Sequence, residues 1–547
     1  MDYNKLAELL FPHIDKTPEY YEEHFPKRVL PEGAKVTRLG PSPTGFIHLG
    51  NLYGAFADER LAHQSGGVFY LRIEDTDDKR YVEGAVETII KSLDFFGINF
   101  DEGALLDGED GSYGPYYQSR RGEIYQCFAK EMVKKGQAYP CFLTEDEINE
   151  IRAYQEANKL NPGIYGQFAK CRDMSLEEIQ SKIDAGIPYV VRLKSDGNTD
   201  EPAHISVEDG IRGELSMPEN TQDTVILKTN GIPTYHFAHV IDDHFMRTTH
   251  VVRGAEWIPS LPIHVELFTK LGFEMPIFCH TGQLMKIDEE GNKRKLSKRK
   301  DPELSLDYYR NEGYHPDAVR EYLLTILNSN FEEWRIANPD APVSEFDFTV
   351  EKMNGGGALF DLNKLEDVSK DVLVKIPSAT LYDFIKEWAE EFRPDLLPVL
   401  EDKAYWLKVL DLDRTGEKPR KDLIKASQII EYFRYFFEYS RQDEFPAEAA
   451  ADANEILTRY LDSYDHSDNQ SGWFEKIRGI TADLGYAVKP KDFKKHPEDY
   501  KGHVGHVSTV IRIALTGRAQ SPDIWEIQQI MGEELTRERI KAQIKQL

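Results

Sequence analysis

The chain is poor in cysteine, lacks long apolar runs and carries fewer basic than acidic residues. Four cysteines in 547 residues are too few for a disulfide scaffold and fit a reducing compartment. No apolar stretch approaches the roughly 20 residues that a membrane-spanning helix needs. The first residues lack the apolar core of a signal peptide and the Arg/Ser bias of a transit peptide. The sequence therefore predicts a cytoplasmic protein without a membrane partner.

The excess of acidic over basic residues in the whole chain argues against binding to nucleic acid. The 67 basic and 95 acidic residues give a net charge of −28, whereas phosphate binding draws on clustered Lys and Arg. The local distribution matters more than the sum. Between Lys286 and Lys300 there are seven basic and three acidic residues, and a second basic cluster runs from Lys489 to Lys495. An acidic body with basic contact faces is compatible with RNA.

The chain is too long for one hydrophobic core, so several domains are expected. From Val36 a short strand, a Pro/Gly turn, a helix over about 50–64 and a strand through Phe69, Leu71 and Ile73 follow one another. Apolar residues from Val82 to Leu93 then recur at helical spacing. This alternation predicts an α/β, Rossmann-like, doubly wound parallel sheet.

The remaining pattern predicts an α+β insertion in this domain and an all-helical C-terminal region. We expect an N-terminal extension at 1–34, two halves of the Rossmann-like domain at 35–114 and 231–275, an insertion at 115–230, a region carrying a basic loop at 276–375 and a helical region at 376–547. The clearest helices of the last region are predicted over 424–439 and 523–547. No internal repeat or low-complexity segment is evident.

A phosphate site is predicted where the first strand turns into its helix. His48, Gly50 and Asn51 open that helix, whose free backbone N–H groups and positive dipole end attract phosphate. Gly50 leaves room for a nucleotide, and His48 can donate a hydrogen bond to phosphate oxygens. The pair alone is equally compatible with an ordinary surface turn, and small nucleotidylyltransferases use a similar pair.

A basic loop far downstream can supply the cations for the same phosphates. Lys295-Leu-Ser297-Lys298-Arg299 could by itself be a solvated charge run. However, a turn at Asp288–Gly291 precedes it and Asp301-Pro-Glu303 follows it, which places the loop between structured elements. Two lysines three positions apart can neutralise a triphosphate as pyrophosphate leaves.

Together the two motifs resemble the HIGH and KMSKS signatures of class I aminoacyl-tRNA synthetases. The resemblance implies ATP binding by His48, Gly50, Asn51, Lys295, Ser297 and Lys298, with His48, Lys295 and Lys298 catalytic and Lys298 the main transition-state contact. It also implies Mg²⁺ and an aminoacyl-adenylate made without a covalent enzyme intermediate. Asn51 and Arg299 depart from the named motifs in ways seen in glutamyl enzymes, and Leu296 is a conservative apolar replacement of the named methionine.

Further residues narrow the resemblance to the bacterial type of glutamyl-tRNA synthetase. The segment Arg38-Leu-Gly-Pro-Ser-Pro-Thr-Gly45 is similar to that family's R-F-A-P-S-P-T-G opening. Glutamate needs arginines for its carboxylates and an acid for its ammonium, and Arg38 offers bidentate geometry for the side-chain carboxylate. The resemblance implies glutamate binding by Arg38, Ser42, Glu74, Tyr235, His239 and Arg253. His239 stands where better-known bacterial members have asparagine.

Each of these residues also has a structural interpretation. Arg38 and Arg253 could pair with structural acids, Glu74 could start a helix, and Tyr235 could be a core aromatic. Jointly they favour a substrate pocket, because Arg38 and Glu74 each follow a predicted strand where such folds bind ligands. Glutaminyl-tRNA synthetase is the nearest alternative, but it resembles R-F-P-P-E-P-N-G and R-F-D-D-T-N at these places.

No metal site is predicted. Some family members hold zinc in the insertion on cysteines, but here Leu143 takes the place of a second cysteine after Cys141, and Asp173 follows Cys171. Two thiolates do not make a closed four-ligand zinc site, so we interpret them as buried thiols. Cys279-His280 has no partner at metal-ligand spacing and is interpreted as core.

The resemblance finally implies tRNA(Glu) and L-glutamate as partners and a monomeric enzyme. The helical region would bind the anticodon and the insertion the acceptor stem. The aromatic run Tyr432–Tyr439 could stack on RNA bases, but at helical spacing core packing is favoured. The sequence leaves open whether tRNA(Gln) is also glutamylated, and it gives no function for residues 1–34.

Overall fold

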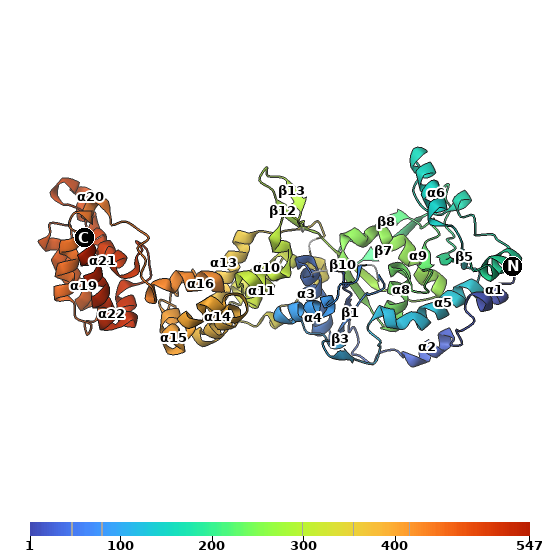
Figure 1. The fold of residues 1–547 in the computed structure, drawn as a ribbon, viewed down its shortest axis with the longest axis horizontal. Coiled ribbons are helices and arrows are strands. Elements are labelled where there is room, and N and C mark those ends of the chain that lie inside the picture. Colours follow the sequence, from blue (N-terminus) through green and yellow to red (C-terminus); the bar gives the residue numbers. More distant parts are fainter. Residues whose placement is uncertain (45–46, 78–79, 298, 354, 415) are drawn as a thin grey trace. The chain divides into compact units, whose positions relative to one another are not determined.

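The computed structural model describes residues 1–44, 47–77, 80–297, 299–353, 355–414 and 416–547. The chain forms two compact units. The first contains Met1–Tyr308 and Arg320–Asp361, and the second contains Tyr309–Val319 and Leu362–Leu547. The first unit is α/β and the second is helical, so the predicted fold class is confirmed (Figure 1). The helical unit resumes at Leu362, before the boundary that the sequence places at 376.

The first unit alternates strands with helices. Its elements, with two helices that extend across the unit boundary, are α1 (Tyr3–Leu10), α2 (Pro18–His24), β1 (Val36–Leu39), α3 (Leu49–Gln64), β2 (Val68–Leu71), α4 (Ala85–Phe95), β3 (Glu102–Leu105), β4 (Gly108–Asp110), α5 (Gly122–Lys134), β5 (Ala138–Cys141), α6 (Glu145–Ala157), α7 (Leu176–Asp184), β6 (Val190–Leu193), β7 (His204–Asp209), β8 (Gly213–Pro218), β9 (Val225–Leu227), α8 (Tyr235–Phe245), β10 (His250–Gly254), α9 (Leu261–Leu271), β11 (Ile277–Thr281), β12 (Leu284–Ile287), β13 (Lys293–Lys295), α10 (Leu306–Glu312), α11 (Pro316–Leu327), α12 (Phe331–Ala337) and β14 (Ala358–Leu359).

Two parallel sheets meet at β1 and β10. Strands β1, β2 and β3 are parallel and β4 closes that sheet antiparallel, whereas β10, β11 and β7 are parallel and β8 closes the second sheet. The Thr249 N–H donates to the Val36 carbonyl over 2.9 Å, so the start of β10 is tied to the start of β1. The next strand after β1 therefore lies on one side of it and β10 on the other. Such a switch point leaves a crevice at the carboxyl ends of the strands.

Helix α3 fixes the position of the first motif at this crevice. It packs on β1, β2 and β10 and buries residues on most of its surface, including Leu52, Phe56 and Leu61. Gly66 ends the turn after it with φ of +67°, and a Cβ on Gly67 would collide with the Lys35 carbonyl oxygen. The predicted helix over 50–64 is thus confirmed to within one residue.

The segment predicted as an insertion divides between two sheets. Strands β5, β6 and β9 form a separate antiparallel sheet, and α6 begins at the Thr144 capping box. The β7–β8 hairpin instead joins the second sheet of the nucleotide fold, where Asp209 pairs with Phe278 of β11. This placement brings Asp209 beneath the crevice.

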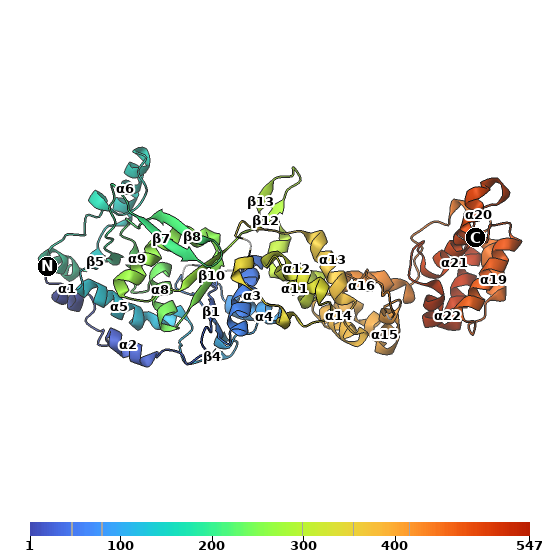
Figure 2. The same cartoon turned by 180° about the vertical axis from the view of Figure 1, so that it is seen from behind.

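The N-terminal extension braces the first unit. Helix α1 packs on α5 (Figures 1 and 2), and Lys130 of α5 donates to the Phe11 and Ile14 carbonyls over 3.1 and 2.9 Å. Arg28 donates two hydrogen bonds to Glu102 of β3, of 2.7 and 2.9 Å. The extension is therefore part of the fold and not a loose tail.

The basic loop begins in a β-hairpin. Strands β12 and β13 pair antiparallel with Met285 opposite Lys295, and β12 also pairs with β14. The predicted turn before the loop is confirmed, because the Asp288 N–H donates to the Asn292 carbonyl and Gly291 has φ of +84°.

The second unit buries a core formed by its helices. These are α13 (Leu362–Leu373), α14 (Ser378–Phe392), α15 (Lys403–Asp411), α16 (Ala426–Phe433), α17 (Ala447–Ala450), α18 (Ala453–Ser463), α19 (Gln470–Asp483), α20 (Pro490–Lys495), α21 (Val504–Thr516) and α22 (Ile524–Gln546). The helix predicted over 424–439 is wrong in length, since α16 ends at Phe433. Phe433, Tyr435 and Phe436 are buried, which confirms their core role.

Among the described residues, no helix is both long and apolar enough to cross a membrane.

Candidate functional site

A cavity of about 750 Å³ opens at the switch point and brings both motifs together. Its lining includes nine residues of the predicted site: Arg38, Ser42, His48, Gly50, Asn51, Glu74, Tyr235, Arg253 and Lys295. Leu296 of the basic loop also lines it. Lys298 lies outside the described residues. Ser297 and His239 do not line the cavity. The sequence pattern therefore locates most of one shared site.

His48 and Asn51 form the start of α3. The His48 backbone N–H donates to Asn51 Oδ1 over 3.2 Å, which ties the N-cap residue to the first turn. A Cβ on Gly50 would approach the His48 imidazole to 3.2 Å, so glycine leaves the ring its place. His48 also forms an isolated antiparallel bridge with Ser305, a residue just after the basic loop. The helix start and the loop thus share one wall of the cavity.

The basic loop is held in shape by one carboxylate. Arg294 donates two hydrogen bonds to Asp301, of 2.6 and 2.7 Å, and the Ser297 N–H donates a third of 2.8 Å. The Arg294 guanidinium lowers the pKa of Asp301 to about 2. Lys286 pairs with Glu303 behind the loop. This frame places Lys295 in the lining of the cavity.

The end of the cavity around Arg38 and Glu74 is an arginine–carboxylate network. Arg72, directly after β2, contacts Asp243 over 2.7 Å and Glu74 over 2.9 Å. Arg38 on β1 lies 3.5 Å from Asp243, and the His239 Nδ1 lies 2.7 Å from the same carboxylate. Burial opposes the ionisation of Asp243, but Arg72, His239 and Arg38 hold its pKa well below its usual range. Asp243 is therefore the anionic centre that orders the arginines.

Tyr235 forms a wall of this end. Its hydroxyl accepts a hydrogen bond from Arg253 of 3.4 Å, and its ring packs on Trp257 with centroids 4.6 Å apart. His239 also stacks on Tyr235, with ring centroids 5.7 Å apart and an interplanar angle of 6°. His239 is completely buried, which lowers its pKa to about 3, so it is neutral at pH 7. His239 does not line the cavity itself, but it contacts Tyr235, which does.

Several residues of the site carry no signal in the sequence. Arg72 and Asp243 are 171 positions apart, and Asp209, His264 and His280 come from three other elements. His280 is buried as predicted for core, but its Nε2 accepts a hydrogen bond from Arg253 of 2.9 Å. Only the folded chain brings these groups into contact.

Asp58 on α3 is a buried acid at the cavity wall. It is 1% exposed, and neither carboxylate oxygen has a hydrogen-bond partner among the described residues. Burial raises its pKa well above the usual 3.8. Folding at neutral pH must therefore bind a proton or bury a charge, and either costs stability.

We expect Asp58→Asn to stabilise the first unit by about 1–3 kcal/mol at pH 8, since the variant needs no proton. A group whose pKa is raised on folding contributes stability below its unfolded pKa and loses it as pH rises. The gain should therefore shrink towards pH 4. Urea unfolding at several pH values measures it, with the exposed Asp107→Asn as the matched control. A gain that is independent of pH would contradict the assignment.

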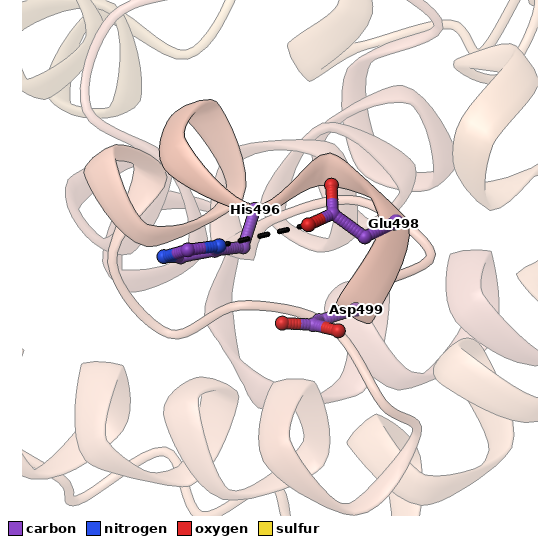
Figure 3. A group of neighbouring side chains, drawn as sticks. All are labelled: His496, Glu498 and Asp499. Atoms are coloured by element: carbon purple, nitrogen blue, oxygen red, sulfur yellow. Dashed lines mark ion pairs between the residues drawn. The ribbon is translucent and has the colours of Figure 1, made fainter.

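No closed metal site is found among the described residues. Cys141 and Cys171 are buried free thiols in mutual contact, and the hydrogen bond from Cys171 lowers the pKa of Cys141. Figure 3 shows the one described group with ligand atoms close together, His496, Glu498 and Asp499, all exposed. Exposed acids with one imidazole lack the enclosed ligand set of a structural zinc site, and we assign them no metal.

Comparison with known proteins agrees with this geometry. A family model described as tRNA synthetases class I (E and Q), catalytic domain, matches residues 35–367, and one described as anticodon binding domain matches 387–544. A glutamate–tRNA ligase of Acetivibrio thermocellus is 61% identical over 99% of this chain and 100% of its own, and one of Clostridium perfringens strain 13 is 50% identical over the same shares.

Solved structures agree as well. The crystal structure of a glutamate tRNA ligase from Elizabethkingia meningosepticum, in complex with its amino acid, is similar with a TM-score of 0.74 and 29% identity. The match covers 94% of this chain and 99% of that one. The similarity therefore extends over both units.

Proposed function

Because the chain belongs to the class I aminoacyl-tRNA synthetases of the glutamate and glutamine group, we propose that it ligates L-glutamate to tRNA(Glu) with ATP. The single observation that carries this proposal is the shared cavity. It joins a phosphate-binding helix start and Lys295 to two buried arginines and Glu74. These are the groups that a nucleotide and a dicarboxylic amino acid require.

The proposed reaction has two balanced steps. An oxygen of the glutamate α-carboxylate attacks the α-phosphorus of ATP, forming glutamyl-adenylate and releasing pyrophosphate. A hydroxyl of the terminal tRNA adenosine then attacks the carbonyl carbon, forming the ester and releasing AMP, while its proton passes to solvent. The protein contributes position and charge, which suffices for in-line transfer without an enzyme-bound intermediate.

At the ATP end, His48 and Lys295 meet the developing negative charge. Gly50 and Asn51 expose the backbone of the first turn of α3 to phosphate. Lys298 and Ser297 complete the set from the basic loop, with Lys298 as the main contact to the departing pyrophosphate. Mg²⁺, which keeps water and phosphate oxygens as ligands in such sites, would accompany the triphosphate.

At the glutamate end, Arg38 holds the side-chain carboxylate and Arg253 the other carboxylate. Glu74 receives the ammonium group, and Ser42 stands beside it, donating to the Glu74 carbonyl over 3.0 Å. Tyr235 forms the wall, and His239 acts through it. Glutamine is disfavoured, because a neutral amide would leave a buried arginine unpaired.

The helical unit is proposed to bind the anticodon, and the insertion the acceptor stem. Such an enzyme works in the cytoplasm, and we propose a monomer. Charging assays with labelled glutamate and glutamine, on transcripts of tRNA(Glu) and tRNA(Gln), test the function. We expect glutamate on tRNA(Glu). Glutamate on both tRNAs would make the enzyme non-discriminating, and glutamine alone would overturn the proposal.

A further inference from the structure

Three buried histidines and one half-buried histidine lie together at the glutamate end of the cavity. His236 and His239 come from α8, His264 from α9 and His280 from β11. The His264 ring lies 4.6 Å from that of His239 and 5.2 Å from that of His236. Such a concentration of imidazoles is costly unless they are neutral and hydrogen-bonded. The hydrogen bonds of His280, His264 and, through His264, His236 lead to one residue, Arg253.

Arg253 is held by imidazoles and not by a carboxylate. Its Nε donates to His280 Nε2 over 2.9 Å, and its Nη1 lies 3.3 Å from His264 Nδ1. The guanidinium also covers the Phe278 ring at 4.7 Å. Its Nη2 has no hydrogen-bond partner in the described part of the chain. The Arg253 guanidinium is thus fixed in place, and its Nη2 donor remains available.

Asp209 selects the tautomer of His280. The His280 Nδ1 lies 2.6 Å from Asp209 Oδ2, so this nitrogen carries the proton and Nε2 is free to accept from Arg253. Asp209 is itself held by the Ile211 and Arg212 N–H groups, each at 3.0 Å. On the other side, His264 Nε2 contacts His236 Nδ1 over 3.0 Å. These contacts give both ring nitrogens of His280 and of His264 a partner.

Arg72 and Arg253 differ in whether a directly bonded acid compensates their positive charge. Burial works against Arg72, but Asp243 raises its pKa well above the usual value, so the guanidinium is neutralised by a direct partner. Burial lowers the pKa of Arg253, and burial also lowers those of His264 and His280, which stay neutral. Arg253 therefore keeps a positive charge that no directly bonded group cancels. That charge is available to a bound carboxylate.

We propose that His280, oriented by Asp209, and His264 are positioning residues that hold Arg253 uncompensated for a carboxylate of the amino-acid substrate. This inference rests on the proposed function, which places Arg253 in the glutamate pocket. A carboxylate at either imidazole position would pair with Arg253 and compete with substrate. Neutral acceptors fix the guanidinium without that competition.

The key variant is Asp209→Asn, whose amide can donate to His280 Nδ1 and so move the ring proton to Nε2. That proton would face the Arg253 donor. We expect the KM for glutamate in tRNA(Glu) charging to rise roughly 10- to 100-fold, the scale of an unpaired buried donor. The KM for ATP should change by less than about 3-fold, because the ATP end is not touched.

His280→Gln separates orientation from folding. Glutamine offers a neutral acceptor and has no tautomer, so Asp209→Asn should add little in the His280→Gln background. The exposed His204→Gln, on the same strand as Asp209, is the matched control. Equal losses from Asp209→Asn in both backgrounds, or parallel rises in both KM values, would overturn the proposal. If the wild-type enzyme did not attach glutamate to tRNA(Glu), the proposed function itself would be overturned.

Discussion

His48→Ala is expected to lower kcat for glutamyl-adenylate formation by about 100- to 1000-fold, the usual loss for one transition-state donor. His48 caps α3 and lies in the cavity wall shared with the basic loop, where charge builds on the α-phosphate. The KM for glutamate should change by less than about 3-fold, since the amino-acid end is formed by other elements. ATP–pyrophosphate exchange in the presence of tRNA measures both constants.

Two further variants make this test specific. His48→Asn keeps a donor and should recover part of the rate. His63→Ala removes the other histidine of α3, at its last turn, and should leave kcat nearly unchanged. A near-normal rate for His48→Ala would show that the phosphate contact is made elsewhere.

Arg38→Met is expected to raise the KM for glutamate by roughly 30- to 1000-fold, because truncating one partner of a buried charge pair costs that much. Arg38 is 5% exposed and lines the cavity, while Asp243 keeps Arg72 as its main partner. The apolar side chain should therefore remove substrate binding without unpairing Asp243. Steady-state charging with varied glutamate measures the change.

Selectivity gives a second measure of Arg38. The preference in kcat/KM for glutamate over glutamine should fall in Arg38→Met, because the penalty for an unpaired arginine disappears. Arg38→Lys keeps the charge but not the bidentate fork and should lie between the wild type and Arg38→Met. An unchanged preference in Arg38→Met would move side-chain recognition to another residue.

Local structure follows closely from local sequence. The Thr144 and Ser175 capping boxes start α6 and α7, and the helix predicted over about 50–64 is found at Leu49–Gln64. The failures have local causes too. Helix α4 begins at Ala85 after a left-handed Gly84, so Val82 precedes it and is exposed, and α16 stops at Phe433 where a 3₁₀ turn follows. Periodicity located these helices but not their ends.

The sequence by itself determined the chemistry of this protein, because the residues of each motif are neighbours in the chain. His48 with Gly50, and Lys295 with the loop after it, predict a phosphate site before any folding is known. Only the tertiary structure decided which charges cancel. Arg72 meets Asp243, while Arg253 meets His280 and His264. Electrostatic pairing depends on distance in space, and strands far apart in sequence supply it.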